Sequence, residues 1–422
     1  MARAVGAIVR FQALPAPPPQ QFDYPVLVAS LASAAFQAFV SDTTDSTGAA
    51  GAVVGFSTTA GHGRVQISVP TLGFADTAHY TVGPGNPARL VATPADTQVF
   101  LGNTVQVRVS LQDTWGNPRS DPITYSVLGS SITVNSSGLA TATGSGVGRV
   151  IALAGAVADT VNIAVIPQAS IAAYRAGIYP EGIVVMGVNV SNLVFIGGAV
   201  VTDWAPSPTW DPAGTHVVFA SGDRLYVSAA DGGSSPSLLI NPSVTNMTQE
   251  LTPQIARSTG KVFFTAGFSG SLSIWQIDAN GSNPAEVLAS GPHNYRQPSP
   301  RPDGTRIAVV EDGVNIRVLD VGSHSLSSWS VAGTCPQWSP LSDKIAYMRN
   351  NTVRIVNADG TQDRQISPQG HYYNPWTSGW SPDEHWLVAH SDNSGLELID
   401  VTTGGAISIT GTANYYYPTW KP

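Results

Sequence analysis

The sequence predicts an all-β chain in which N-terminal β-sandwich domains precede a six-bladed β-propeller closed by the C-terminal strand. The 42 Gly and 31 Pro residues, with abundant Val, Ser and Thr, favour short strands and tight turns over helices. A Trp-x-Pro motif also recurs; if degenerate copies are included, its spacing is about 40 to 46 residues, the length of a propeller blade. Clear copies begin at Trp210, Trp338, Trp380 and Trp420.

The N-terminal third is predicted to consist of short strands separated by turns. Prolines 15, 17, 18 and 19 indicate that residues 1–21 form an extended, Pro-rich lead-in. Residues 26–35 are predicted to be strands, and the strand predicted at 36–42 has a counterpart at 105–113. Two tandem units, 22–86 and 87–167, are therefore predicted to be β-sandwiches.

The second of these units resembles the bacterial Ig-like (Big) family. Its opening, PARLVATP at residues 87–94, looks like the first strand of that family, and NSSGLATA at 135–142 looks like its late hairpin. The resemblance covers 87–167 and extends to 22–86. It implies Ig-like modules that act as stalks or adhesive units on bacterial surfaces and carry no catalytic residues.

From about residue 172 each repeat has the same internal order. The motif leads through a turn to an apolar strand, then to a third strand and a polar hairpin such as Asp231-Gly232. This pattern resembles the WD-like repeats of the TolB-type β-propeller family over residues 172–422. Five whole blades are expected to start near residues 208, 253, 298, 336 and 378.

The sixth blade is expected to combine both ends of this region. Residues 182–188, 192–197 and 199–204 are predicted to supply three of its strands, and residues 416–420 to supply the innermost one. Such closure would remove the free sheet edges that make open sheets aggregate.

The charge balance limits the classes of partner. Charged residues make up 11% of the chain and the net charge is -8, which argues against a nucleic-acid partner. No apolar run reaches the ~18 residues that a membrane-spanning segment needs. A surface with so few charges suits an extracellular or cell-surface protein, with the periplasm as the alternative, and no leader peptide is visible in the chain. The single Cys335 is expected to fill a small space in the core.

The segments that lead into the innermost strands carry the candidate binding residues. Connections of this kind converge on one mouth of a propeller channel, where Tyr and His offer a flat apolar face with a polar tip. The alternative is that these side chains wedge between neighbouring blades. The candidates for contact with a protein or polysaccharide partner are His293, Tyr295, His371, Tyr372, Tyr373, Tyr415, Tyr416 and Tyr417.

Two other repeated features have structural interpretations. The motif tryptophans could form a binding ladder, but recurrence in phase favours a role in blade packing. The hairpin aspartates faintly echo a calcium loop, but Asp and Asn followed by Gly are also what tight hairpins require. We therefore expect no metal and no cofactor.

Catalytic motifs are missing from the sequence. It has no Gly-x-Ser-x-Gly elbow, no His-Glu-x-x-His and no Gly-rich phosphate loop. We therefore expect a non-enzymatic structural or binding protein of the bacterial exterior, in which Ig-like modules present the propeller. Residues 1–21 could also add as a strand to another copy and build a filament. The alternatives are a polysaccharide lyase or glycosidase and a periplasmic scaffold similar to TolB.

Overall fold

A computed structural model describes residues 5–15, 26–31, 35–177, 180–196, 206–240, 249–268, 270–374 and 379–422. Within these ranges the regular elements are β-strands and one short 3₁₀ turn, Pro70–Leu72, so the prediction of an all-β chain is confirmed. No helix in the described ranges is long and apolar enough to cross a membrane. The chain divides into two compact units, Met1–Ala142 with Gly148–Ile163 and Thr143–Val147 with Ala164–Pro422.

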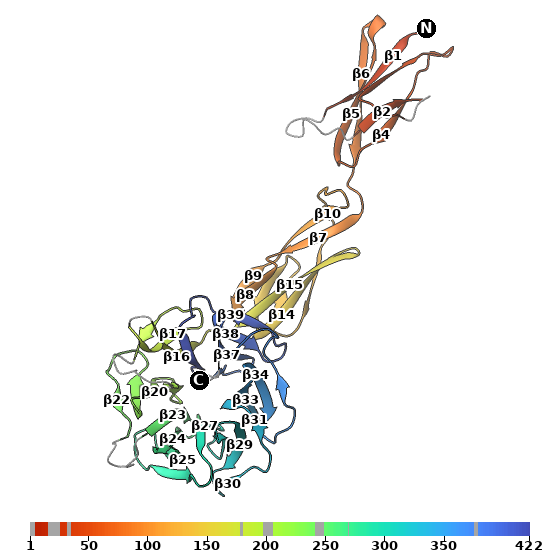
Figure 1. Ribbon diagram of the computed structural model, residues 1–422. Helices are drawn as coiled ribbons and strands as arrows, with labels where there is room; N and C mark the ends of the chain where they lie inside the picture. Colours follow the sequence, from red (N-terminus) through yellow and green to blue (C-terminus); the bar gives the residue numbers. More distant parts are fainter. Residues whose placement is uncertain are drawn as a thin grey trace. The chain divides into compact units, whose positions relative to one another are not determined.

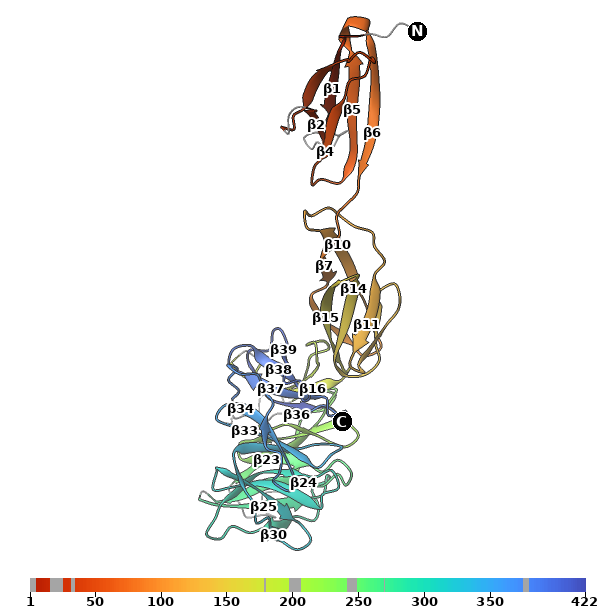
Figure 2. The same ribbon diagram turned by 90° about the vertical axis from the view of Figure 1, so that its right-hand side faces the viewer.

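The first unit begins with two sheets that share one core. The larger sheet has the order β3-β1-β5-β6, with bounds Phe39–Thr43, Ile8–Leu14, Gly61–Val69 and Phe74–Val82. The smaller sheet pairs β2 (Val26–Ser30) with β4 (Ala52–Phe56). Val9, Phe11 and Val65 of the larger sheet pack with Val26 and Val28 of the smaller one. Figure 2 shows β1, β5 and β6 side by side.

This arrangement corrects the prediction for the N-terminus. Residues 8–14 do not form a separate lead-in, because β1 lies inside the first sheet and pairs with β3 on one side and β5 on the other. The strand is therefore occupied within its own chain, and the predicted filament by strand addition would have to displace one of these pairings. Prolines 17, 18 and 19 lie outside the described residues.

The rest of the first unit is built from three further sheets. β7 (Pro87–Thr93) pairs with β10 (Arg108–Asp113). The four-stranded sheet β11-β14-β15-β8 comprises Thr124–Leu128, Gly146–Ala154, Val157–Ile166 and Asp96–Phe100. The sheet β12-β13-β9 comprises Ile132–Val134, Leu139–Ala142 and Thr104–Gln106. The predicted strands at 87–94 and 105–113 thus coincide with β7, β9 and β10.

The second unit has the arrangement of a β-propeller (Figure 1). Its described residues form six antiparallel sheets that follow one another around a ring. Five sheets begin at an innermost strand close to a predicted blade start: β19 (Thr209–Trp210), β23 (Gln249–Ile255), β27 (Tyr295–Pro300), β32 (Thr334–Trp338) and β36 (Gly379–Trp380).

The outer strands of these five sheets follow in chain order. The second strands are β20 (His216–Ser221), β24 (Val262–Phe268), β28 (Arg306–Glu311), β33 (Lys344–Arg349) and β37 (Trp386–Ser391). The third are β21 (Arg224–Ala229), β25 (Ser271–Ile277), β29 (Asn315–Asp320), β34 (Thr352–Asn357) and β38 (Gly395–Asp400). The outermost are β22 (Ser237–Leu238), β26 (Ala285–Leu288), β30 (Ser325–Leu326), β35 (Arg364–Gln365) and β39 (Ala406–Ser408), and β31 (Val331–Ala332) also pairs with β29.

The sixth sheet joins the two ends of this unit. Its order is β18-β17-β16-β40, with bounds Val194–Phe195, Gly182–Gly187, Ser170–Arg175 and Tyr415–Trp420. The expectation that the C-terminal strand completes this sheet agrees with the pairing of Ile171 with Trp420 and of Arg175 with Tyr415. The expected order of strands in this sheet is wrong by one strand. Residues 182–188 were expected next to the C-terminal strand, but β16 lies between β40 and β17. Residues 199–204, predicted as a strand, lie outside the described residues.

Four of the innermost strands share a bulge three residues before the motif position. Thr252, Gln297, Cys335 and Tyr417 all have φ between 50° and 53°, and the strand register shifts there in β23, β27, β32 and β40. Non-glycine residues rarely adopt this left-handed conformation, and a bulge reverses the alternation of side chains along a strand. The bulge therefore determines which side chains of these four strands are buried.

Candidate functional site

The first group of candidates lies at the amino-terminal ends of the innermost strands, which we call the amino-terminal rim. His293 precedes β27 and its Nδ1 lies 2.7 Å from Oδ2 of Asp312, a residue of the turn between β28 and β29. This hydrogen bond to Asp312 raises the pKa of His293. Tyr295 lies just beyond it, buried in the core of its sheet. His293 is thus exposed and fixed, whereas Tyr295 is a packing residue.

A second group gathers around one buried carboxylate. Glu397 of β38 accepts hydrogen bonds from the Tyr373 hydroxyl and the Ser394 hydroxyl, and its Oε2 lies 3.1 Å from Nδ1 of His371. Burial of Glu397 favours its neutral form, but the hydrogen bonds from Ser394, Tyr373 and His371 outweigh burial and lower its pKa. Glu397 is therefore held as a carboxylate, and it fixes the Tyr373 and His371 rings, which stack with centroids 6.3 Å apart.

A third group lies beside β40. The ring of Tyr416 stacks on His390, with centroids 4.4 Å apart. Burial lowers the pKa of His390, so this ring is neutral at physiological pH. Asn374 contacts both Nδ1 of His390, at 3.1 Å, and the carboxylate of Asp392.

The structure separates the eight candidates by exposure. Tyr373 is fully buried and Tyr295, Tyr415 and Tyr417 are 7%, 5% and 6% exposed, so these four pack inside the protein. Tyr372 is 59% exposed, and the side chains of His293 and His371 are 44% and 40% exposed. Of the eight candidates, His293, His371 and Tyr372 are thus open to a partner, and Tyr416 is partly buried.

The motif tryptophans lie at the opposite, carboxyl-terminal ends of the innermost strands. Trp210, Trp338, Trp380 and Trp420 are between 0% and 7% exposed, as blade packing requires. The indole N–H of Trp380 donates to the Gln337 carbonyl at 2.9 Å. That of Trp210 donates to the Thr419 carbonyl at 3.3 Å, so each of these two rings ties its blade to the preceding one.

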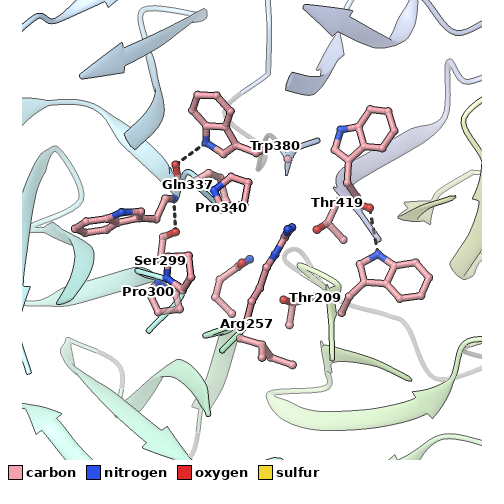
Figure 3. A pocket seen from close by; sticks show the side chains of 15 residues that line it. Thr209, Arg257, Ser299, Pro300, Gln337, Pro340, Trp380 and Thr419 are labelled. Carbon is pink, nitrogen blue, oxygen red and sulfur yellow. Dashed lines mark hydrogen bonds between the residues drawn. The ribbon is translucent and has the colours of Figure 1, made fainter. Parts of the chain in front are cut away.

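The same four tryptophans also line a cavity, which we call the Trp cavity (Figure 3). Its volume is about 50 Å³, and residues from all six sheets contribute to it. Arg257 points into the middle of the lining side chains. The sequence around it, Ile255-Ala256-Arg257-Ser258, is a poor copy of the Trp-x-Pro motif, and an arginine in the place of the proline is the sequence feature that distinguishes this repeat.

Other predicted features have local roles in the described residues. Asp231, Asp278, Asp359 and Asp400 cap their own hairpins through hydrogen bonds to nearby backbone or side-chain groups, and so does Asp320. No group of three or more His, Cys, Asp and Glu side chains suited to a metal ion is found in the described ranges. Cys335 is buried within a core cluster, where burial raises its pKa to about 12.

Comparisons with known proteins concern the fold. No protein-family model and no curated protein matches the sequence. Among solved structures, a protein assigned as a TolB from Agrobacterium tumefaciens is 16% identical, with a TM-score of 0.43, covering 60% of this chain and 99% of its own. The Cps50 (Swd1) β-propeller domain of Myceliophteria thermophila is 10% identical, with a TM-score of 0.38, covering 55% and 82%.

An oligogalacturonate lyase in complex with manganese is also similar. It is 12% identical, with a TM-score of 0.37, covering 58% of this chain and 72% of its own. The neighbours thus include TolB-like and other β-propellers, and likenesses of this size transfer no activity.

Proposed function

We propose that this chain is a non-enzymatic binding protein of the cell surface or extracellular space. Its N-terminal sandwiches are taken as Ig-like modules that present a closed, six-bladed, TolB-like propeller. The propeller takes a protein or polysaccharide partner on its amino-terminal rim. The scarcity of charged residues, 11% of the chain, supports an exterior location.

The observation that carries this proposal is the pair His371 and Tyr372. Tyr372 is 59% exposed, so most of its ring is open to a partner. Its neighbour His371 is held by Glu397 and stacks on buried Tyr373. A partner that binds there meets a preorganised surface and loses little conformational entropy, which favours affinity. Tyrosine is also enriched at binding surfaces because it combines apolar area with a polar tip.

The state of Glu397 supports a binding role over hydrolysis of a polysaccharide. A glycosidase needs a carboxylic acid whose pKa is raised, paired with a second carboxylate across the scissile bond. The pKa of Glu397 is lowered instead, and its oxygens are occupied by Tyr373, Ser394 and His371. The arrangement holds side chains in place and leaves no proton on Glu397 to give to a leaving group.

The test is binding of the full chain to an array of bacterial and plant polysaccharides and surface proteins. We expect Tyr372→Ala to weaken binding by about tenfold or more, as the loss of a central aromatic contact does. Leu238→Ala is the matched control, because it removes a 48% exposed apolar side chain from outermost strand β22. Equal binding by wild type and Tyr372→Ala would refute the assignment of the rim, and polysaccharide cleavage lost in Glu397→Gln would refute the non-enzymatic role.

A further inference from the structure

The Trp cavity lies at the far ends of the innermost strands from the amino-terminal rim. β27 runs from Tyr295 at the rim to Pro300 at the cavity, and β40 runs from Tyr415 to Trp420. A strand of six residues spans ~20 Å. The cavity is therefore a second location, separate from the surface on which the proposed function depends.

One blade departs from the motif at a position that the other five share. At the third position of the motif five repeats have proline, and the repeat of β23 has Arg257 instead; the prolines are Pro212, Pro302, Pro340, Pro382 and Pro422. The same repeat has Ile255 where four others have tryptophan. The smaller side chain and the long cation occur together, so this blade differs from its neighbours in the part that faces the cavity.

Arg257 has no partner for its charge. No hydrogen bond or ion pair joins its guanidinium to any described residue, although Arg301, Arg306, Arg317 and Arg354 all pair with carboxylates. The other described residues that line the cavity are Thr, Trp, Gln, Ile, Ser, Pro and Gly, which carry no charge. Arginine stays protonated in proteins, and Arg257 is partly buried in this cavity, so its charge gains from an anion that enters. Burial lowers the pKa of Arg257, and no nearby carboxylate offsets this shift.

The other polar side chains of the lining can donate hydrogen bonds to an anion. Thr209, Ser299 and Thr419 contribute hydroxyls, and Gln254 and Gln337 contribute amides. Ser299 already accepts a hydrogen bond from the Trp338 backbone N–H at 2.8 Å, which leaves its own proton free to be donated. In Figure 3, Ser299, Thr209 and Thr419 surround Arg257.

We infer that the Trp cavity is a binding site for one small monocarboxylate anion, held by the Arg257 guanidinium with the hydroxyl and amide side chains of the lining. The planar guanidinium matches a carboxylate in a two-bond, charge-assisted arrangement. One cation balances one negative charge, which favours a carboxylate over a doubly charged phosphate. A cavity of about 50 Å³ has room for a few non-hydrogen atoms, and tryptophan and proline walls suit a short apolar group on the acid.

The experiment titrates the full chain with sodium acetate, with sodium chloride at equal ionic strength as the reference and sodium phosphate as the competing anion. Binding is read from tryptophan fluorescence and from the melting temperature, which rises when a ligand binds the folded state. The variants are Arg257→Gln and, as the matched control, Arg364→Gln, which removes the same charge from outermost strand β35.

We expect saturable acetate binding by the wild type and by Arg364→Gln, and a midpoint raised about tenfold or more in Arg257→Gln. In chloride, Arg257→Gln should melt at or above the wild-type temperature, because it removes an unpaired charge. Equal midpoints for wild type and Arg257→Gln, or no acetate effect beyond chloride, would overturn the inference. Tighter binding of phosphate than of acetate would overturn the carboxylate assignment, and this wild-type comparison stands even if Arg257→Gln does not fold.

Discussion

At the scale of single residues, Glu397 is the clearest electrostatic contributor to stability. Its carboxylate accepts hydrogen bonds from Tyr373 and Ser394 and contacts His371, and these bonds lower its pKa from the ordinary value of 4.5. Because the folded chain binds this proton less readily than the unfolded chain, the contribution is complete above about pH 4.5 and is lost as pH falls through the lowered pKa.

We predict that Glu397→Gln destabilises the propeller by about 1.5–3 kcal/mol at pH 7, the usual contribution of hydrogen bonds to a charged group. The difference from wild type should shrink as pH falls below 4.5, because protonated Glu397 resembles glutamine. Urea unfolding at several pH values between 7 and 3.5 measures it. Glu286→Gln, an exposed site on β26, should match wild type throughout, and a difference for Glu397→Gln that does not depend on pH would contradict the argument.

The rim tyrosines show where residue-level prediction from the sequence stops. Three consecutive tyrosines, 415 to 417, looked equivalent in the sequence, yet Tyr415 and Tyr417 are buried and Tyr416 stacks on His390. Tyr415 and Tyr417 are buried as regular alternation requires, and the bulge at Tyr417, with φ 53°, then shifts the alternation so that Trp420 is buried as well. The bulge and the partners far along the chain, such as His390, are not visible in a local pattern.

At the scale of elements, β40 should be indispensable. It is the innermost strand of the sixth sheet, and its Trp420 is fully buried. Its removal would leave β16 as an open edge and expose the core that Trp420 covers. We predict that deletion of residues 416–422 lowers the melting temperature of the propeller by more than 10 °C or prevents folding, since a buried Trp alone contributes about 3–5 kcal/mol.

The control for this deletion is removal of Pro422 alone, an exposed residue beyond the end of β40. Circular dichroism melts of the two shortened chains and the full chain give the comparison. An unchanged melting temperature after removal of 416–422 would show that the pairing of β40 with β16 does not hold the ring together.

The elements that the sequence predicted best are those that the motif marks. The positions of β23, β27, β32 and β36 follow from the motif, because the first residue of each motif copy is the last residue of the innermost strand. The motif cannot mark β16, since that strand is the second of its sheet and its motif residue, Trp420, belongs to the other end of the unit. β1 was hidden for a different reason: the neighbouring prolines suggested polyproline, while its pairing partners lie at β3 and β5.

At the scale of the whole molecule, the two compact units should unfold as separate cooperative blocks. Each has its own core: Phe11 lies in the core of the first sandwich, and Phe264 is fully buried in the second unit. Deletion of a buried Phe side chain costs about 3–5 kcal/mol and acts on the block that contains it. The two matched substitutions Phe11→Ala and Phe264→Ala should therefore lower different transitions in scanning calorimetry.

Cys335 tells the two transitions apart. It lies in the second unit, is 2% exposed and has its pKa raised to about 12 by burial, so it stays unreactive while the propeller is folded. Alkylation with iodoacetamide during heating should advance to lower temperature in Phe264→Ala and stay at the wild-type temperature in Phe11→Ala. If both substitutions advanced alkylation equally, the two units would unfold as one block, and the sandwiches and the propeller would depend on each other for stability.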